Sequence, residues 1–438
     1  MPEEDKPNVK KAVAINLRNL RKSKRLSQAK LADKCGIGVV TIRKIEKGAA
    51  DPRYSTLAVI SKELGVTVDE LLTERKTLAN VRFRAEFKRD MKDEERLLRS
   101  RGQVLADIAK KLELYQWLES VIVSISNASA TPPIHFRPYL FNELAQNFKS
   151  GGPSNNGVAD LSKARKAADE ARKVLAKEGI LKLRRISTGA SGFENDETTE
   201  DCQPIHDICG LLESAGFRVL LAVVANNDWW GLSVASDDIW NRPAVVVNDW
   251  SRITTERKIF SAAHELGHHI MHLPSFDVSK IEDSKTEEDE ANHFASHFLM
   301  PGKAFESEWH DAEGHNFAKS VWKVKQIFSV SYKTVLHRIQ HEYGLKDVYQ
   351  RYHRACKYAG FKTRGISSKE EHFPIGKHVF TTDRFPKMVR VALENRAITL
   401  IQAAEASGLS IKDMREIRAT WIDKSETEVD EKDMVPIA

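Results

Sequence analysis

The stretch from residue 260 to residue 272 constrains this chain most, because it holds the pattern His-Glu-x-x-His inside an apolar frame. An α-helix turns by roughly 100° per residue, so His264 and His268 lie one turn apart on the same face and can bind one metal ion. Glu265 lies beside that ion rather than on it, where it can accept a proton from a water molecule that a metal has acidified. Apolar residues at helical spacing on both sides favour this interpretation over a decayed or purely structural use of the pattern. The sequence therefore predicts a helix that carries a zinc site.

A third ligand is expected from a second, acidic helix that ends at Pro301. Its first turn presents Glu288 one turn before Asn292. A carboxylate at this place would complete a site with two histidines, one glutamate and an open fourth position, which is typical of catalytic rather than structural zinc. Glu288 is the preferred candidate. Glu290 stays an alternative, because the sequence does not fix the rotation of the helix about its axis.

Other histidines near the motif are interpreted as packing or ligand-orienting groups. His272 lies one turn beyond His268, but it has drifted by about 80° from the face that His264 defines. Met271 and Pro274 occupy the positions at which the longer metzincin pattern needs its Gly and third His. The histidines interpreted in this way are His269, His272, His293 and His297.

Composition and cysteine usage set the class of protein. The 438 residues are 41% hydrophobic and 30% charged, which is typical of a soluble globular protein with several domains. The four cysteines are too few and too scattered for a disulfide framework, so we expect a reducing compartment. The longest apolar run, residues 219–225, has the length of a strand and is far too short to cross a bilayer. The expected location is therefore the cytoplasm, with no membrane contact.

The N-terminal part of the chain is basic and helical. Residues 1–50 contain 13 Lys or Arg against 5 Asp or Glu, an excess larger than the net charge of +6 of the whole chain. This local excess favours an anionic partner. From residue 12 to residue 72 the apolar spacing predicts a compact all-helical unit, in which Ser27 caps a short helix and Gly36 allows a tight turn into the next one. The side chains expected to point outwards from that next helix are Val39, Val40, Thr41, Arg43 and Lys44.

Residues 12–72 resemble the helix-turn-helix domain of the XRE family of phage-repressor-like regulators. The resemblance rests on the spacing of small, apolar and turn residues, namely Ser27-Gln28, Leu31-Ala32, Gly36, Ile42, Ile45-Glu46 and Gly48. It implies a five-helix domain that binds double-stranded DNA. It also implies that the helix from Val39 to Lys47 enters the major groove while Gln28 and basic side chains hold phosphates. A homodimer is expected if one copy reads one half-site.

The rest of the chain divides by its composition into four regions. Residues 73–157 are interpreted as a charged helical linker region, in which residues 73–103 form a solvated helix. Residues 158–310 contain three predicted strands and the metal helix. They are followed by a helical module at 311–360 that resembles a helix-turn-helix, and by a helical tail at 361–438 that is expected to be disordered from about residue 425. The expected fold is α+β and mostly helical, with a zincin-like domain built on a small sheet.

A second resemblance, to the ImmA/IrrE family of metallo-endopeptidases, covers the chain from about residue 163 to residue 343. It rests on a set of separate motifs: Val246-Val247-Asn248, Glu256-Arg257-x-x-Phe260, Ala263-His-Glu-Leu-Gly-His268, Glu288-x-x-Ala291-Asn292-x-Phe294-Ala295 and Leu299-Met300-Pro301. The resemblance implies that His264, His268 and Glu288 hold zinc, or manganese in some accounts, and that Glu265 is the catalytic base. It implies helix-turn-helix repressors as substrates. The departures are bulky residues at His297 and Phe298, and no recognisable oxyanion donor.

Two functional hypotheses follow from the sequence. In the first, a DNA-binding regulator cleaves a repressor or an antitoxin-like protein with a zinc-dependent endopeptidase domain. In the second, that domain is a metal-dependent sensor or a partner-binding module without catalysis. An intact Glu265 favours the first hypothesis, because a sensor needs the ligands but not the base. The sequence leaves open whether cleavage acts on another protein or on the chain's own segment from Thr73 to Arg101.

Overall fold

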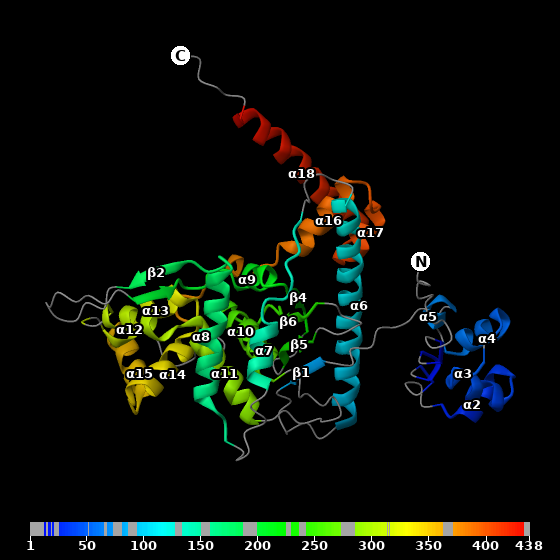
Figure 1. Ribbon diagram of the computed structural model, residues 1–438, viewed down its shortest axis with the longest axis horizontal. Coiled ribbons are helices and arrows are strands. Elements are labelled where there is room, and N and C mark those ends of the chain that lie inside the picture. Colours follow the sequence, from blue (N-terminus) through cyan, green and yellow to red (C-terminus); the bar gives the residue numbers. More distant parts are fainter. Residues whose placement is uncertain are drawn as a thin grey trace. The chain divides into compact units, whose positions relative to one another are not determined.

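The computed structural model describes residues 13–14, 16–18, 20–21, 26–50, 52–64, 68–72, 81–85, 94–127, 134–149, 158–186, 199–224, 229–235, 242–272, 285–312, 314, 316–361 and 371–432. Two compact units make up the chain, Met1–Thr77 and Leu78–Ala438 (Figure 1). Among the described residues, no helix is both long enough and apolar enough to cross a membrane. The side chains of Cys35, Cys209 and Cys356 are buried and free.

The first unit consists of short helices packed around an apolar core, as the sequence predicts. Residues 13–14, 16–18 and 20–21 are helical, and they are followed by α2 (Gln28–Cys35), α3 (Val39–Glu46), α4 (Tyr54–Leu64) and α5 (Val68–Leu72). The hydroxyl of Ser27 accepts the Lys30 N–H at 3.1 Å and caps α2, and Gly36 ends α2 at φ 63°, a left-handed conformation that favours glycine. The core contains Val13, Leu17, Leu31, Ala32, Ile42, Ile45, Leu57, Ile60, Leu64 and Leu71.

The second unit contains a four-stranded mixed sheet with the strand order β1-β5-β6-β4. Its strands are β1 (Val81–Ala85), β4 (Arg218–Ala222), β5 (Trp229–Val234) and β6 (Ala244–Asn248). β4 pairs with β6 in parallel, whereas β5 pairs with β6 and with β1 in antiparallel fashion. The three strands that the sequence predicts after residue 217 are thus confirmed. A separate antiparallel pair is formed by β2 (Leu183–Ile186) and β3 (Thr199–Cys202).

The central strand β6 is buried on both faces, because its side chains alternate between two cores. Val245 and Val247 belong to a core shared with the metal helix, whereas Ala244 and Val246 belong to a core shared with the long helix α6 (Glu94–Asn127). In Figure 1 the sheet accordingly lies between α6 and the group of helices that contains the metal helix, α10 (Thr255–Met271). One face of the sheet therefore supports the metal helix directly.

Helices on that face pack closely through small residues. They are α7 (Asn142–Lys149), α8 (Leu161–Lys177), α9 (Ile208–Ser214), α10 (Thr255–Met271) and α11 (Lys285–Leu299). α11 packs against both α10 and α8. At Gly267 of α10, a Cβ atom would lie 2.9 Å from the Phe294 ring of α11, so only glycine permits this close approach. The buried alanines of α8 (Ala164, Ala167, Ala168 and Ala171) play the same part on the other side of α11.

The remaining helices complete the two cores. They are α12 (Gly302–His310), α13 (Phe317–Phe328), α14 (Tyr332–Tyr343), α15 (Val348–Tyr358), the 3-10 turn η2 (Lys377–Val379), α16 (Arg384–Glu394), α17 (Leu400–Ser407) and α18 (Ile411–Lys432). Helices α12 to α15 join the core around α10 and α11, and helices α16 and α17 join the core around α6.

A buried ion pair ties the C-terminal part to the metal helix. Lys325 of α13 is fully buried, and its Nζ donates to Glu256 Oε1 at 3.1 Å and to Glu371 Oε2 at 3.3 Å. Glu256 Oε1 also accepts the N–H of Ile375 at 2.8 Å. The segment from residue 371 to residue 375 is therefore fixed to the first turn of α10.

Two local expectations are wrong. Residues 81–85 form strand β1 instead of part of a solvated helix, because they pair with β5, and α6 begins only at Glu94. The C-terminal helix α18 continues to Lys432, past the point near Ser425 at which disorder was predicted. Residues 187–198 and the last residues of the chain, 433–438, lie outside the described residues.

Candidate metal centre

Helix α10 presents His264 and His268 on one face, as the spacing of the motif predicts. The Thr254 hydroxyl caps the helix by accepting the Arg257 N–H at 3.3 Å. Both imidazoles are fully buried, and their Nε2 atoms lie 2.8 Å apart. The two side chains therefore point at one place.

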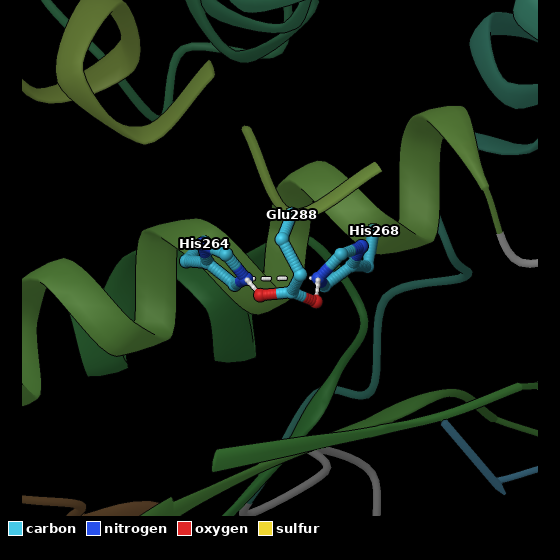
Figure 2. Close-up of side chains that lie close together, drawn as sticks. All are labelled: His264, His268 and Glu288. Atoms are coloured by element: carbon cyan, nitrogen blue, oxygen red, sulfur yellow. Dashed lines mark hydrogen bonds and ion pairs between the residues drawn. The ribbon is translucent and has the colours of Figure 1, made fainter. Parts of the chain in front are cut away.

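Helix α11 brings Glu288 to the same place (Figure 2). Glu288 Oε2 lies 3.3 Å from His264 Nε2, and Glu288 Oε1 lies 3.1 Å from His268 Nε2. One ligand atom from each of the three residues can be chosen so that all lie within 4.8 Å of one another; among the described residues this is the one such group of His, Cys, Asp or Glu. Of the two carboxylates that the sequence leaves open, Glu288 faces the histidines.

Glu290 has a different role, since it binds groups behind the histidines. Its Oε2 lies 3.0 Å from His272 Nε2, and its Oε1 accepts the Asp160 N–H at 2.8 Å. His272 Nδ1 in turn lies 2.9 Å from His268 Nδ1. Burial opposes ionisation of Glu290, but the hydrogen bonds from His272 and from the Asp160 N–H outweigh it and hold the pKa of Glu290 below its usual range.

This chain of contacts fixes which nitrogen of His268 carries the proton. An ionised Glu290 can only accept, so His272 must donate through Nε2–H, and a neutral His272 then accepts at Nδ1. His268 therefore donates through Nδ1–H and keeps the Nε2 lone pair free for a metal ion. Outer partners commonly orient metal-bound histidines in this way. The sequence assigned His272 to the packing or orienting groups; it gave no sign that Glu290 completes the chain, because helix rotation decides this.

Asn292 plays the same part for the other histidine. Its Oδ1 lies 3.0 Å from His264 Nδ1, one turn after Glu288 on α11. An amide oxygen can only accept, so His264 also carries its proton on Nδ1 and presents Nε2 to the site. Both imidazoles are thus prepared as neutral nitrogen ligands.

The donor set fits a zinc ion. Two neutral imidazoles and one carboxylate leave a fourth position open, as in catalytic zinc sites. A carboxylate binds zinc in its ionised form, and the two oxygens of Glu288 lie 3.1 and 3.3 Å from the Nε2 atoms of the imidazoles. Glu288 is therefore an anionic ligand at neutral pH.

Glu265 is fully buried and lies against strand β5. Its Oε2 accepts a hydrogen bond from the Ser233 hydroxyl at 2.5 Å. A Cβ atom at Gly231 would lie 2.8 Å from Glu265 Oε1, so a glycine in the strand makes room for this carboxylate. The sequence did not single out Ser233 or Gly231; a polar residue and a glycine in an apolar strand were the available signal.

A cleft of about 470 Å³ opens beside these residues. Its wall includes Asn292 of α11, Phe260 and Arg257 of α10, and Trp230 of β5. The Arg257 guanidinium stacks over the Trp230 ring, with 3.0 Å between the guanidinium carbon and the ring centroid. Asn292 both lines this cleft and contacts His264 Nδ1, so it connects the cleft with the candidate metal centre.

The other histidines do not join the centre. His269 is buried, its Nε2 lies 3.1 Å from the Ala244 oxygen, and its ring packs edge-on against Phe217, as expected for a packing residue. Burial lowers the pKa of His269 to about 3. His293 and His297 line a separate cavity.

The helix-turn-helix unit places its candidate DNA-contacting residues on two helices. On α3, Val40, Thr41, Arg43 and Lys44 are exposed, and Val39 is half-buried, while Ile42 and Ile45 face the core. Val40 is 55% exposed.

Buried Glu46, at the end of α3, organises the surroundings of Gln28. Its Oε2 accepts from Gln28 Nε2 at 2.7 Å, and its carboxylate pairs with Arg21 at 2.6 Å. Burial raises the pKa of Glu46, but the hydrogen bonds from Arg21 and Gln28 outweigh this and lower it overall. Gln28 is therefore held in place, and one of its two amide hydrogens is used inside the domain.

Comparison with known families identifies two domains. Residues 17–71 match the model described as "Helix-turn-helix". Residues 212–340 match the M78 peptidase model, described as "IrrE N-terminal-like domain". The second match contains α10, α11 and all three candidate metal ligands.

One curated relative agrees with the first of these matches. The chain is 38% identical over 95 residues to the "Uncharacterized HTH-type transcriptional regulator YqaE" of Bacillus subtilis (strain 168), and covers 79% of that protein and 21% of its own length. Among solved structures, a hypothetical transcription factor NHTF from Neisseria is 26% identical (17% of this chain, 87% of that chain, TM-score 0.15). The apo competence regulator ComR from Streptococcus vestibularis is 13% identical (82% of this chain, 95% of that chain, TM-score 0.15).

Proposed function

The chain belongs to the XRE-type helix-turn-helix transcriptional regulators and joins such a domain to an IrrE-like peptidase domain, and we propose that it is a DNA-binding regulator that cleaves a protein by zinc-dependent peptide hydrolysis. The proposed substrate is a repressor or an antitoxin-like protein. The proposed metal ligands are His264, His268 and Glu288, and the proposed catalytic base is Glu265.

The observation that carries the proposal is the position of Glu265. A domain that only sensed a metal would need the three ligands, but it would not need a carboxylate buried next to them. Here Glu265 follows His264 directly, is fully buried, and is oriented by Ser233 and by the space at Gly231. This arrangement of strand and helix supports Glu265 as the proton acceptor of the proposed hydrolysis.

Each residue has a defined part in the proposed reaction. A zinc ion held by His264, His268 and Glu288 would supply Lewis acidity that polarises the scissile carbonyl and acidifies water. Glu265 removes the proton from the attacking water and delivers it to the nitrogen of the leaving amine. The Ser233 hydroxyl holds the carboxylate of Glu265 toward the site through both steps.

Strand β5 supports an extended peptide as the substrate. An extended peptide binds to a sheet by adding a strand, and β5 lies directly beside Glu265. On its outer side β5 already pairs with β1, with Gly231 opposite Arg84. Because β5 pairs with β6 on its other side, an external substrate that pairs with β5 would have to displace β1. Alternatively, the chain presents its own segment there, since β1 lies between the two matched domains.

The DNA-binding part of the proposal assigns roles to both helices of the motif. Helix α3 enters the major groove, where Arg43 and Lys44 can contact bases or phosphates and exposed Val40 can pack against a thymine methyl group. Gln28 keeps one amide hydrogen for a backbone phosphate after binding Glu46. The contacts of Val39 and Thr41 complete the same surface.

The deciding experiment compares the native chain with Glu265→Gln in cells and maps new protein termini. We expect a terminus inside a helix-turn-helix protein in native cells that is missing from the variant. Asp289→Asn is the matched control, because Asp289 is exposed on α11 next to Glu288. Purified Glu265→Gln should keep its zinc, whereas His264→Ala should lose it.

Two results would count against hydrolysis. If Glu265→Gln gives the same termini as the native chain and still controls its target genes, the domain is a metal-dependent sensor. If His264→Ala binds as much zinc as the native chain, the proposed centre is wrong. DNA binding is tested separately: Arg43→Ala should weaken binding to a selected operator and reduce its salt dependence, whereas Lys62→Ala, exposed on α4, should not.

A further inference from the structure

A second cavity lies away from the candidate metal centre, among helices α8, α11 and α14. Its volume is about 160 Å³. Four histidines and two arginines line it; the arginines are Arg165 of α8 and Arg338 of α14. The proposed peptidase chemistry uses none of these residues, and the family matches assign them no role.

Several buried polar atoms that line this cavity lack hydrogen-bond partners within the described part of the chain. Arg338 is only 1% exposed, yet its Nε and Nη1 atoms make no hydrogen bond, and its Nη2 atom has only an ion-pair contact with Glu342 at 3.2 Å. Ser296 Oγ and His297 Nδ1, both buried on α11, also make no hydrogen bond. Buried polar groups in folded proteins are nearly always paired. So many unpaired atoms around one cavity therefore indicate a ligand that pairs with them.

The two arginines favour an anionic ligand, although Glu342 also lines the cavity. Arg338 has one ion-pair partner, Glu342 Oε1 at 3.2 Å, and Arg165 reaches the same oxygen only at 3.9 Å. Both guanidinium groups also lie next to Gly302, the first residue of α12, where the helix N-terminus adds positive potential. Asp169 and Glu306 are the other acidic groups that act on Arg338.

The histidines supply neutral donors instead of further charge. Burial and the positive charge of Arg338 lower the pKa of His297 to about 2 and that of His293 to about 4. His337 and His341 of α14 face them, and burial lowers the pKa of His337 as well. Among the described residues, these imidazoles do not form a group that converges on a metal ion. Two guanidinium groups, a hydroxyl and imidazole N–H groups are donors for an oxyanion.

We propose that this cavity binds a small phosphate-type oxyanion, with Arg338 and Arg165 as its charged ligands and Ser296 and His297 as its neutral ones. A guanidinium fork matches the oxygens of a phosphate in two parallel hydrogen bonds. The cavity shares Ser296 and His337 with the larger cleft, so the anion is either free phosphate or a phosphate group whose remaining molecule extends into that cleft. The occupant contacts α11, the helix that also carries Glu288, whether or not the metal centre is catalytic.

The test is a titration of the full-length, zinc-loaded protein with inorganic phosphate, followed by calorimetry at pH 7 in a phosphate-free buffer. The native chain should bind one phosphate saturably. Arg338→Gln and Arg165→Gln should each weaken binding about tenfold or more, because each removes a charge-assisted pair. Arg354→Gln, at an exposed arginine of α15, is the control and should bind like the native chain.

Three further readouts keep the test decisive. Arg165 is half-exposed, so Arg165→Gln is expected to fold even if Arg338→Gln does not. An arginine whose role is to bind a ligand contributes little to stability when the ligand is absent, so without phosphate the variants should melt close to the native chain. Added phosphate should raise the melting temperature of the native chain but not of the variants. Adenosine monophosphate distinguishes the sources: stronger binding than phosphate identifies a nucleotide phosphate, and weaker binding identifies a free oxyanion. Absence of saturable phosphate binding by the native chain, or binding by both variants equal to that of the native chain, overturns the proposal.

Discussion

The chain of contacts behind His268 gives the sharpest prediction, for the substitution Glu290→Gln. The N–H of Asp160 can only donate, so the new amide oxygen stays with it and the new NH₂ group faces His272. His272 must then accept at Nε2 and place its proton on Nδ1, opposite His268. His268 in turn has to accept at Nδ1, which moves its own proton to Nε2, the atom that is proposed to bind the metal.

The expected magnitude follows from the bond that is lost. To bind zinc, His268 must again carry its proton on Nδ1, which forces His272 to carry its proton on Nε2. The Nε2–H of His272 then faces the new NH₂ group, where the ionised carboxylate had accepted a hydrogen bond. A hydrogen bond to a charged group contributes about 1.5–3 kcal/mol. This corresponds to zinc affinity that is roughly 10- to 100-fold weaker, which is the range that outer partners of metal ligands usually account for. The same reasoning applies to Asn292→Leu, which removes the acceptor of His264 Nδ1, whereas Asn292→Asp keeps an acceptor and should bind zinc well.

Zinc affinity can be measured by competition with a fluorescent chelator at pH 7, together with a thermal melt to confirm folding. Asp289→Asn is the matched control, since it removes a carboxylate from the same turn of α11 without touching the histidines. If folded Glu290→Gln holds zinc as tightly as Asp289→Asn, the proposed control of the His268 tautomer is wrong.

Three other predictions test the support of the site. Lys325→Met leaves Glu256 buried without its counter-charge and should lower the free energy of unfolding by about 3–5 kcal/mol; an unchanged urea midpoint would contradict this. Burial raises the pKa of Glu213 from 4.5 to about 7, so the folded state keeps this proton longer than the unfolded chain and loses stability as pH rises between these values. Glu213→Gln should therefore be more stable than the native chain at pH 8, by roughly 2 kcal/mol, and equal to it near pH 4, as measured by urea unfolding at both values. Replacing both Phe83 and Arg84 by proline removes at least one N–H that pairs β1 with β5, and should speed cleavage of an added substrate if β1 competes with it; an unchanged rate would show that β1 does not block the site.

Local patterns were enough to predict much of this architecture. The helical spacing around His264 and His268 predicts α10, since the pattern depends only on neighbours one turn apart. Capping chemistry at Ser27 likewise predicts the start of α2, and the left-handed turn at Gly36 predicts its end. Each of these features is decided within a few residues of the chain, so the sequence contains the information directly.

The choice between Glu288 and Glu290 is of another kind, because it depends on how far α11 is rotated about its axis. That rotation is set by contacts with distant parts of the chain. Phe294 packs into the space left by Gly267, and the N–H of Asp160 donates a hydrogen bond to the carboxylate of Glu290. Strand β1 was missed for the same reason, since its partner β5 lies well over a hundred residues away. The alternation of Val81, Phe83 and Ala85 with two arginines is a short strand signal, and it was overlooked within a densely charged stretch. The geometry of the candidate metal centre thus depends on contacts that local sequence patterns do not predict. Substitution of the residues that orient the histidines, and not only of the ligands themselves, should therefore weaken metal binding while the chain still folds.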